Sequence, residues 1–235
     1  MNLKNSVAII TGASKGIGRS VAIALSREGV NVVLAARSPE LLSMIQKEII
    51  EAGGKAISIP TDVTSENSVQ NLIIETQKRL GKIDILINNA GVGIFSNVVD
   101  LKMQDYEAMM DVNLKGVFLC SRAVLPAMIK QQKGEIINIA SLAGKNSFAG
   151  GSVYSATKWG LIGFSRSMML EVREHNIRVV TISPGSVNTH FADKNKEESQ
   201  IIQPEDVAET VIFALTMPNR VNVSEIDIRP TLKPR

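Results

Sequence analysis

Short apolar runs alternate with longer amphipathic stretches along most of the chain. Runs rich in Val, Ile and Leu predict six β-strands, at residues 7–10, 31–35, 56–59, 83–87, 135–139 and 178–182. Several of these runs lack polar alternation, which is typical of strands covered on both faces of a parallel sheet. Helices are predicted near residues 16–28, 39–52, 65–80, 104–131, 152–174 and 204–217, and an edge strand at 223–228.

Strand and helix follow each other six times, which predicts one α/β domain over residues 1–235. We therefore expect a Rossmann-type, doubly wound parallel sheet with helices on both faces. The chain length suits a single domain of this kind. One stretch, 192–200, is markedly polar. It is either a solvated loop or a flap beside an active site, so a short polar lid is expected at about 190–203.

Composition describes an ordinary soluble protein, with 44% hydrophobic residues, 21% charged residues and a formal net charge of +3. Acidic and basic residues are interspersed, so no nucleic-acid partner is expected. The single Cys120 cannot form an internal disulfide. The sequence contains no Cys/His cluster, so no metal site is expected. No apolar run approaches the roughly 18 residues of a membrane helix. No signal peptide is recognisable, and a cytoplasmic location is expected.

The first predicted strand leads into a glycine-rich loop with the spacing G-x-x-x-G-x-G, and a helix begins there. Glycines let the backbone approach a bound phosphate, and the free N–H groups of the helix N-terminus face that anion. A bare turn is the alternative, but the flanking strand and helix favour a dinucleotide site. The candidate residues in this loop are Gly12, Ser14, Lys15, Gly16, Ile17 and Gly18.

The end of the second strand indicates which dinucleotide the site takes. NAD sites usually place Asp or Glu there, to bind the ribose 2′-hydroxyl. This chain has Ala36-Arg37, and Lys15 can point to the same place. Two cations suit a 2′-phosphate, so NADP(H) is the expected cofactor; two solvated surface charges are the alternative. Asp62 and Val63, after the third strand, are expected near the adenine, although Asp62 could instead cap a helix.

The motif Asn88-Asn89-Ala90-Gly91 follows the fourth strand. Small and amide side chains at this point can join neighbouring strands while leaving room for a ribose, and a tight turn is the alternative. Asn89, Ala90 and Gly91 are therefore further cofactor-binding candidates.

Tyr154 and Lys158 are four residues apart, on one face of a predicted helix. A phenol with a pKa of about 10 is a poor acid at neutral pH, and we expect the nearby ammonium to lower that pKa.

Carbonyl reduction needs a hydride, which a nicotinamide supplies, and a proton, which a tyrosine can supply. Ser141 can hydrogen-bond the carbonyl oxygen. Asn113 can hold a water molecule that links Lys158 to solvent. Each residue has a structural explanation by itself, and their joint occurrence indicates catalysis.

These motifs resemble those of the classical short-chain dehydrogenases/reductases over nearly the whole chain. The shared pattern is T-G-x-x-x-G-x-G at 11–18, N-N-A-G at 88–91, Asn113, Ser141, Y-x-x-x-K at 154–158 and P-G at 184–185, followed by Thr189. The resemblance implies a Ser141–Tyr154–Lys158 catalytic centre supported by Asn113, with Tyr154 and Lys158 also contacting the cofactor. It further implies that the nicotinamide end is contacted by Pro184, Gly185, Val187 and Thr189.

Within that family, residues 136–184 resemble the 3-oxoacyl-acyl-carrier-protein reductases. The chain departs from them in three places: 225–231 lacks their Asp-Gly-Gly tail, 184–204 is short for their substrate lid, and Gln132 and His175 replace arginines. A general ketone or aldehyde reductase is therefore an alternative. A cofactor-binding regulator without chemistry is another, although such proteins usually lack the tyrosine or the lysine. The expected walls of the substrate pocket are Ile94, Leu142, Phe148 and Phe191, with His190 as a further lining or surface residue.

The predicted helices at 104–131 and 152–174 carry many apolar residues. An apolar stripe at helical spacing most often belongs to the core. The resemblance implies that this helix pair also packs against its mate in a four-helix interface. A homodimer or homotetramer is therefore expected.

Overall fold

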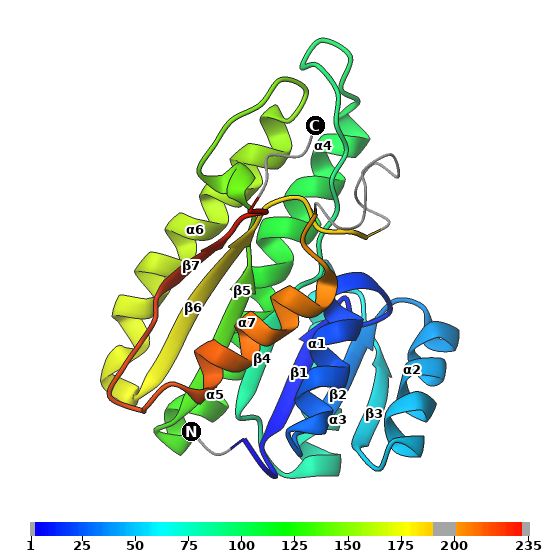
Figure 1. Ribbon diagram of the computed structural model, residues 1–235, viewed down its shortest axis with the longest axis vertical. Coiled ribbons are helices and arrows are strands. Elements are labelled where there is room, and N and C mark those ends of the chain that lie inside the picture. The colour runs from blue at the N-terminus through cyan, green and yellow to red at the C-terminus, as the bar shows by residue number, and fades with distance from the viewer. Residues whose placement is uncertain (1–2, 190–200, 232–235) are drawn as a thin grey trace.

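A seven-stranded parallel sheet forms the centre of the molecule (Figure 1). The computed structural model describes residues 3–189 and 201–231. The strands are β1 (Val7–Thr11), β2 (Asn31–Ala36), β3 (Lys55–Pro60), β4 (Ile85–Asn88), β5 (Gly134–Ile139), β6 (Ile177–Pro184) and β7 (Glu225–Ile228). Their order is β3-β2-β1-β4-β5-β6-β7, so the direction of strand addition reverses between β1 and β4. Open α/β sheets bind ligands at such a reversal.

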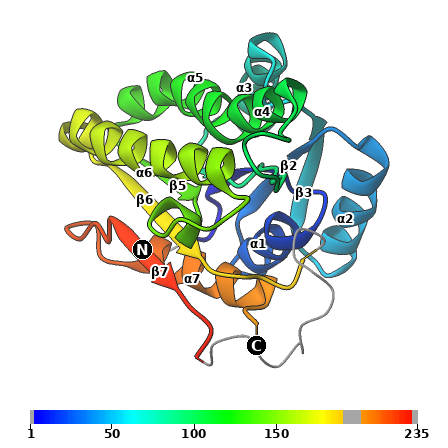
Figure 2. The same cartoon turned by 90° about the horizontal axis from the view of Figure 1, so that it is seen from above.

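Helices cover both faces of this sheet (Figure 2). On one face lie α1 (Gly16–Arg27), α2 (Pro39–Glu51) and α7 (Pro204–Thr216), and on the other lie α3 (Glu66–Leu80), α5 (Gly116–Gln131) and α6 (Ser152–Val172). The shorter elements are α4 (Met103–Met110), the π-helix η1 (Asp111–Lys115) and the 3₁₀-helices η2 (Leu142–Gly144) and η3 (Arg173–His175). The predicted doubly wound α/β fold is confirmed, including the edge strand, which pairs parallel with β6.

The central strands are buried along their whole length, which explains why they lack polar alternation. All residues of β1, β4, β5 and β6 are buried. Successive residues of a strand point to opposite faces, so Ile10 belongs to the same core cluster as Leu25 of α1, while Ile9 belongs to the cluster of Leu72 of α3. Both faces therefore need apolar side chains, and the strand becomes a continuous apolar run.

The helix predicted at 104–131 is interrupted at its centre. α4 and α5 are joined by η1, whose π-helical turn contains Asn113. Next to it, a Cβ at Gly116 would lie 2.9 Å from Val63 Cγ2, so Gly116 lets the helix closely approach the segment that follows β3. A π-turn accommodates one extra residue and is frequent at functional sites. A single extra residue barely changes the apolar periodicity, so the sequence pattern predicts an unbroken helix.

The combined helix Met103–Gln131 is long and apolar enough, by length and composition, to cross a membrane. The core helices of globular proteins meet the same criterion. Within its most apolar window, 44% of the residues are buried inside the protein, and α5 packs with β4 and β5. We interpret it as a core helix.

Buried polar side chains join the carboxyl ends of β4 and β5 to two helices. Asn88 Nδ2 donates to Asn138 Oδ1 at 2.8 Å and to Ser121 Oγ at 3.1 Å, and Asn138 Nδ2 donates to Ser165 Oγ at 2.8 Å. All four residues are buried. Breaking one such bond would leave a buried polar group without a partner, which costs about 1–3 kcal/mol. The bonds therefore fix α5 and α6 relative to the strands that lead into the site.

Candidate active site

The loops at the carboxyl edge of the sheet bring the predicted site residues together. β1, β4, β5 and β6 lead respectively into 12–15, 89–91, Ser141 and 185–189. In Figure 1 the segments that precede α4 and α6 extend beyond this edge. They are joined by a hydrogen bond from the Ser96 N–H to the Gly150 carbonyl oxygen, at 2.9 Å. These segments form one side of the site.

Gly12 and Gly18 allow the loop after β1 to pack directly on the loop after β4. Asn89 Nδ2 donates to the carbonyl oxygens of Thr11 and Gly12, at 3.0 and 3.2 Å. A Cβ at Gly12 would lie 2.8 Å from Ala90 Cα, and one at Gly18 would lie 2.5 Å from Asn89 Nδ2. Thr11 Oγ1 also accepts hydrogen bonds from the N–H groups of Asn89 and Ala90. Larger residues would separate the two loops.

The helix α1 begins at this loop. Lys15 is its N-cap residue, and the Lys15 side chain makes no capping hydrogen bond. Free N–H groups at a helix N-terminus attract anions. Gly16 has a φ of +56°, and its Cβ position lies 3.2 Å from Thr189 Cγ2. The loop after β6 therefore lies against the glycine loop.

Lys15 and Arg37, the predicted phosphate ligands, are both exposed. Asp62 accepts hydrogen bonds from the Thr64 N–H and hydroxyl, at 2.9 and 2.8 Å. The backbone bond from Thr64 is the main cause of the lowered pKa of Asp62, and the charge of Arg37 adds to it. Ser65, rather than Asp62, caps α3. Arg37 and Asp62 are thus close enough for their charges to interact.

Ser141, Tyr154 and Lys158 meet where β5 approaches α6. The side chains of Tyr154 and Ser141 are hydrogen-bonded. Ser141 Oγ also accepts a hydrogen bond from the Ala143 N–H at 3.1 Å, which orients it. Lys158 Nζ lies 5.8 Å from the centre of the Tyr154 ring and donates to the Ile139 carbonyl oxygen at 3.0 Å. The structure brings together the three residues predicted from their spacing.

Burial alters the acid–base properties of this pair. Tyr154 is 8% exposed and Lys158 is 5% exposed. Burial raises the pKa of Tyr154, and the hydrogen bond with Ser141 offsets part of that change. Burial also lowers the pKa of Lys158 to about 8. The expected net decrease in the pKa of Tyr154 is therefore wrong for this structure, because desolvation of the phenol dominates.

Asn113 connects the loop after β4 to the turn of α6 that carries Tyr154. Its Oδ1 accepts from the Val92 N–H and its Nδ2 donates to the Val92 carbonyl oxygen, both at 2.8 Å. Nδ2 also donates to Thr157 Oγ1 at 3.1 Å, and Thr157 Oγ1 donates to the Tyr154 carbonyl oxygen at 2.7 Å. Asn113 is fully buried. These contacts give it a structural role; its water-holding role stays a prediction.

Gly91, in the loop after β4, lies close to Lys158. A Cβ placed on Gly91 would lie 3.5 Å from Asn113 Oδ1 and 3.9 Å from Lys158 Nζ. The predicted cofactor-binding motif N-N-A-G and the predicted catalytic residues are therefore adjacent in space.

The loop after β6 continues the same edge. The Gly185 N–H donates to the Ile228 carbonyl oxygen of β7 at 2.9 Å. Val187 is buried and pairs with Ile202, and Thr189 lies beside the glycine loop. The described end of the expected lid, 201–203, contains two buried isoleucines and is packed against this loop.

The predicted pocket walls lie in the described chain with one exception. Ile94 packs in a small cluster with Tyr154, and Leu142 Cδ1 lies 3.2 Å from the Cβ position of Gly185. Phe148 is exposed in the segment before α6. Phe191 lies outside the described residues, as does His190.

Phe95 is a site residue that sequence reasoning missed. Its ring meets the Tyr154 ring edge to face, with centroids 5.5 Å apart, and meets the Phe148 ring at 5.6 Å. It is half exposed. Its position directly after Ile94, in the loop that follows the N-N-A-G motif, was the available signal. Phe95 and Phe148 form an aromatic wall next to the phenol of Tyr154.

Most apolar residues of the two predicted interface helices belong to the core. Val124, Met128, Leu161 and Met168 are buried. Phe118 of α5 is 42% exposed and packs edge to face with the ring of Phe164. Within 3–189 and 201–231, no group of three or more His, Cys, Asp or Glu side chains could hold a metal ion.

Comparison with known proteins agrees with this geometry. A family profile described as short chain dehydrogenase matches residues 6–200. An uncharacterised oxidoreductase of Staphylococcus aureus (strain USA300) is 38% identical over 229 residues, which cover 97% of this chain and 98% of that relative.

Two solved structures share the fold over nearly their whole length. A metagenomic short-chain oxidoreductase in complex with NADP is 40% identical, with a TM-score of 0.88, and covers 99% of this chain and 100% of its own. The alcohol dehydrogenase of the archaeon Thermococcus sibiricus, complexed with 5-hydroxy-NADP, is 30% identical, with a TM-score of 0.91 over 98% and 99% of the two chains. Sequence, fold and the arrangement at the carboxyl edge of the sheet therefore lead to one assignment: this chain belongs to the short-chain dehydrogenase family.

Proposed function

We propose that the protein is an NADP(H)-dependent oxidoreductase that reduces a ketone or aldehyde to an alcohol. One observation carries this proposal. The hydrogen-bonded Ser141–Tyr154 pair lies beside Lys158, adjacent to the loop after β4 on which the glycine loop packs. A proton donor next to a dinucleotide cradle is the arrangement that carbonyl reduction requires.

The residues present fit a phosphorylated dinucleotide. Because Gly12 and Gly18 have no side chains, the backbone of the loop is left open to a ligand. The N-terminus of α1 belongs to the same loop, and its N-cap side chain makes no capping hydrogen bond. Arg37 follows Ala36 where an acidic residue would bind an unphosphorylated ribose, and Lys15 adds a second cation. Two similar structures contain NADP or 5-hydroxy-NADP, which supports the same choice. When bound, the nicotinamide supplies the hydride.

In this mechanism Tyr154 donates the proton to the carbonyl oxygen. Because its pKa is raised, the phenol carries its proton near neutral pH, although it is a weaker acid than a free tyrosine. Ser141 hydrogen-bonds the same oxygen as negative charge develops on it. Lys158, with a pKa of about 8, is mostly an ammonium at neutral pH. Its charge stabilises the phenolate that remains after the proton has left.

The substrate class is a small apolar ketone or aldehyde rather than an acyl-carrier-protein thioester. The proposed wall consists of Ile94, Phe95 and Phe148, which are apolar. Gln132 and His175 hydrogen-bond each other at 3.2 Å, between the ends of α5 and η3. Neither provides a permanent cation for an acidic carrier protein.

The protein acts in the cytoplasm as a homodimer or homotetramer in this proposal. The outward faces of α5 and α6 support an interface between copies, because Phe118 is 42% exposed and Trp159 is 53% exposed there. Exposed aromatic residues of this size are enriched at protein interfaces.

Replacing Tyr154 with Phe tests the proton donor. We expect kcat for an activated ketone to fall by about 10²–10⁴-fold, because general acid catalysis is worth roughly that much. NADPH binding, measured by fluorescence titration, should be retained. Tyr106→Phe is the matched control, since it changes the other tyrosine of the chain, and it should leave kcat unchanged. Retained turnover in Tyr154→Phe would remove the proposed donor. NADPH binding without turnover of any ketone in the parent protein would favour the regulator.

Replacing Arg37 with Asp tests the cofactor assignment. We expect the ratio of kcat/KM for NADPH over NADH to fall by about 10–100-fold, because a charge-assisted hydrogen bond to phosphate contributes roughly 1.5–3 kcal/mol.

Lys55→Asp is the control, because it makes the same charge change at the start of β3, at the opposite edge of the sheet. It should leave the ratio unaltered. An unchanged ratio in Arg37→Asp would exclude the phosphate contact.

The buried Lys158 should make stability depend on alkaline pH. Its pKa is about 8 in the native state, whereas an unfolded lysine keeps its proton to a pKa of about 10.4. Between these values the unfolded chain binds more protons, so the free energy of unfolding rises with pH. From pH 8 to pH 10 we expect a gain of about 2 kcal/mol relative to Lys158→Met. Urea unfolding at several pH values measures it. Lys115→Met, at an exposed lysine, should behave like the parent, and parallel curves for Lys158→Met and the parent would contradict the assignment.

Phe95 should contribute to substrate selection. Replacing Phe95 with Ala removes an aromatic contact worth about 0.5–1.5 kcal/mol, so kcat/KM for aryl ketones should fall by roughly 3–10-fold. The value for a small aliphatic ketone should change less. Phe213→Ala is the control, because Phe213 on α7 is equally half exposed. Equal losses for both ketone classes would exclude a role of Phe95 in selection.

A further inference from the structure

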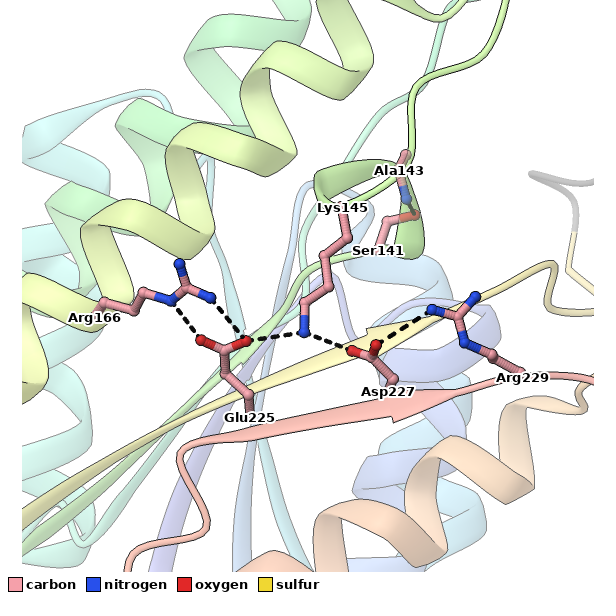
Figure 3. Close-up of polar contacts among 7 residues, drawn as sticks. All are labelled: Ser141, Ala143, Lys145, Arg166, Glu225, Asp227 and Arg229. Atoms are coloured by element: carbon pink, nitrogen blue, oxygen red, sulfur yellow. Dashed lines mark hydrogen bonds and ion pairs between the residues drawn. The ribbon is translucent and has the colours of Figure 1, made fainter.

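Five charged side chains connect α6, the segment after η2 and the edge strand β7 (Figure 3). Arg166 Nε contacts Glu225 Oε1 at 2.5 Å, and Lys145 Nζ contacts Glu225 Oε2 at 2.9 Å and Asp227 Oδ1 at 2.8 Å. Arg229 contacts the other oxygen of Asp227 at 3.4 Å. Lys145 is the central member, because its ammonium bridges two carboxylates.

The alternation of strand residues explains this arrangement. Glu225 and Asp227 are two residues apart on β7, so their side chains point to the same face. Two neighbouring carboxylates on one face repel each other, and the ammonium of Lys145 removes that repulsion. The side chains of Lys145, Glu225 and Asp227 are 28%, 23% and 30% exposed, so solvent screens them less than fully exposed pairs. The contacts raise the pKa of Lys145 and lower that of Glu225 to about 2.

Lys145 belongs to the same short turn as Ser141. Ser141 is the N-cap of η2 and Lys145 is its C-cap. The Gly144 N–H donates to the Ser141 carbonyl oxygen and the Lys145 N–H donates to the Leu142 carbonyl oxygen, both at 2.9 Å. The Ala143 N–H donates to Ser141 Oγ. Because these bonds make the turn one unit, a displacement of Lys145 would be transmitted to Ser141.

The other side of the turn packs directly on α6. A Cβ at Gly144 would lie 2.8 Å from the Lys158 carbonyl oxygen, so this side is in close contact with the backbone of the catalytic helix. At the end of the turn, Lys145 binds Glu225 and Asp227 of β7. The turn that carries Ser141 is therefore held between the helix of Tyr154 and the edge strand.

We infer that Lys145 is a positioning residue, which keeps Ser141 within hydrogen-bonding distance of Tyr154 by binding Glu225 and Asp227. This inference rests on the proposed carbonyl reduction. It also gives the C-terminal segment, where the chain departs from the carrier-protein reductases, a role in the site.

A double-mutant cycle between Lys145 and Ser141 tests the inference. Lys145→Met should lower kcat by about tenfold, part of the 10²–10³-fold loss that removal of an oxyanion donor causes. The Kd for NADPH should change less than about twofold, since the change acts on the reacting oxygen. In a Ser141→Ala background, Lys145→Met should add almost no further loss, because coupled residues are not additive. A purely structural role would give the same loss in both backgrounds and would overturn the inference.

A second readout does not need turnover. In a Tyr106→Phe background Tyr154 is the remaining tyrosine, so NMR of a labelled tyrosine ring reports its pKa alone. The hydrogen bond with Ser141 lowers that pKa. Lys145→Met should therefore raise it, and Ser141→Ala should raise it with no further effect of Lys145→Met. An unchanged pKa in Lys145→Met would overturn the inference even if every ketone tested were a poor substrate.

Two further variants separate positioning from general stability. Lys82→Met removes another lysine that contacts a carboxylate, Asp84, at 2.8 Å, but at the amino edge of the sheet. It should lower Tm without changing kcat or the pKa of Tyr154. If Lys145→Met does not fold, Asp227→Asn weakens the same contact while Glu225 still binds Lys145, and a smaller change in the same direction is expected. Turnover lost equally in Lys82→Met and Lys145→Met would contradict a positioning role. A parent protein with no carbonyl reduction would instead refute the proposed function.

Discussion

Burial of a phenol and an ammonium side by side is the constraint on which the site depends. Tyr154 and Lys158 are both nearly inaccessible to solvent, so the charged form of each is disfavoured. Such groups persist only where neighbouring polar atoms replace part of the lost water. Here the Ile139 carbonyl oxygen accepts from the ammonium and Ser141 bonds the phenol. Any shift of β5 or α6 would break these bonds, which is why the surroundings are so strongly connected.

The surrounding contacts hold the pair from three directions. Asn113 joins the loop after β4 to the turn below Tyr154 through Thr157. The glycine loop packs on Asn89, at positions where a Cβ would collide. On the third side, β7 bonds the loop after β6 and, through Lys145, the turn of Ser141. Each contact joins elements far apart in sequence, so the site depends on the packing of these elements against one another.

The fold and the proximity of the proposed catalytic residues followed from local signals, and the rest did not. Continuous apolar strands and a Tyr–Lys spacing of one helical turn are readable within a few residues. The π-turn at Asn113 and the ring contact of Phe95 depend on packing between distant segments, which no local pattern encodes. The pKa of Tyr154 was predicted with the wrong sign, because spacing reveals a neighbouring charge but not the depth of burial.

The directional geometry of ion pairs explains why charged rather than apolar side chains connect the turn of Ser141 to β7. An apolar contact tolerates sliding, because its energy depends mainly on the area removed from water. An ammonium held by two carboxylates at 2.8 and 2.9 Å resists displacement in several directions. Such a contact adds little stability where solvent reaches it. The contact instead fixes the position of the turn, and a misplacement of about 1 Å can cost an enzyme roughly 10²-fold in rate. The edge strand can therefore matter for the reaction while contributing little to the free energy of unfolding.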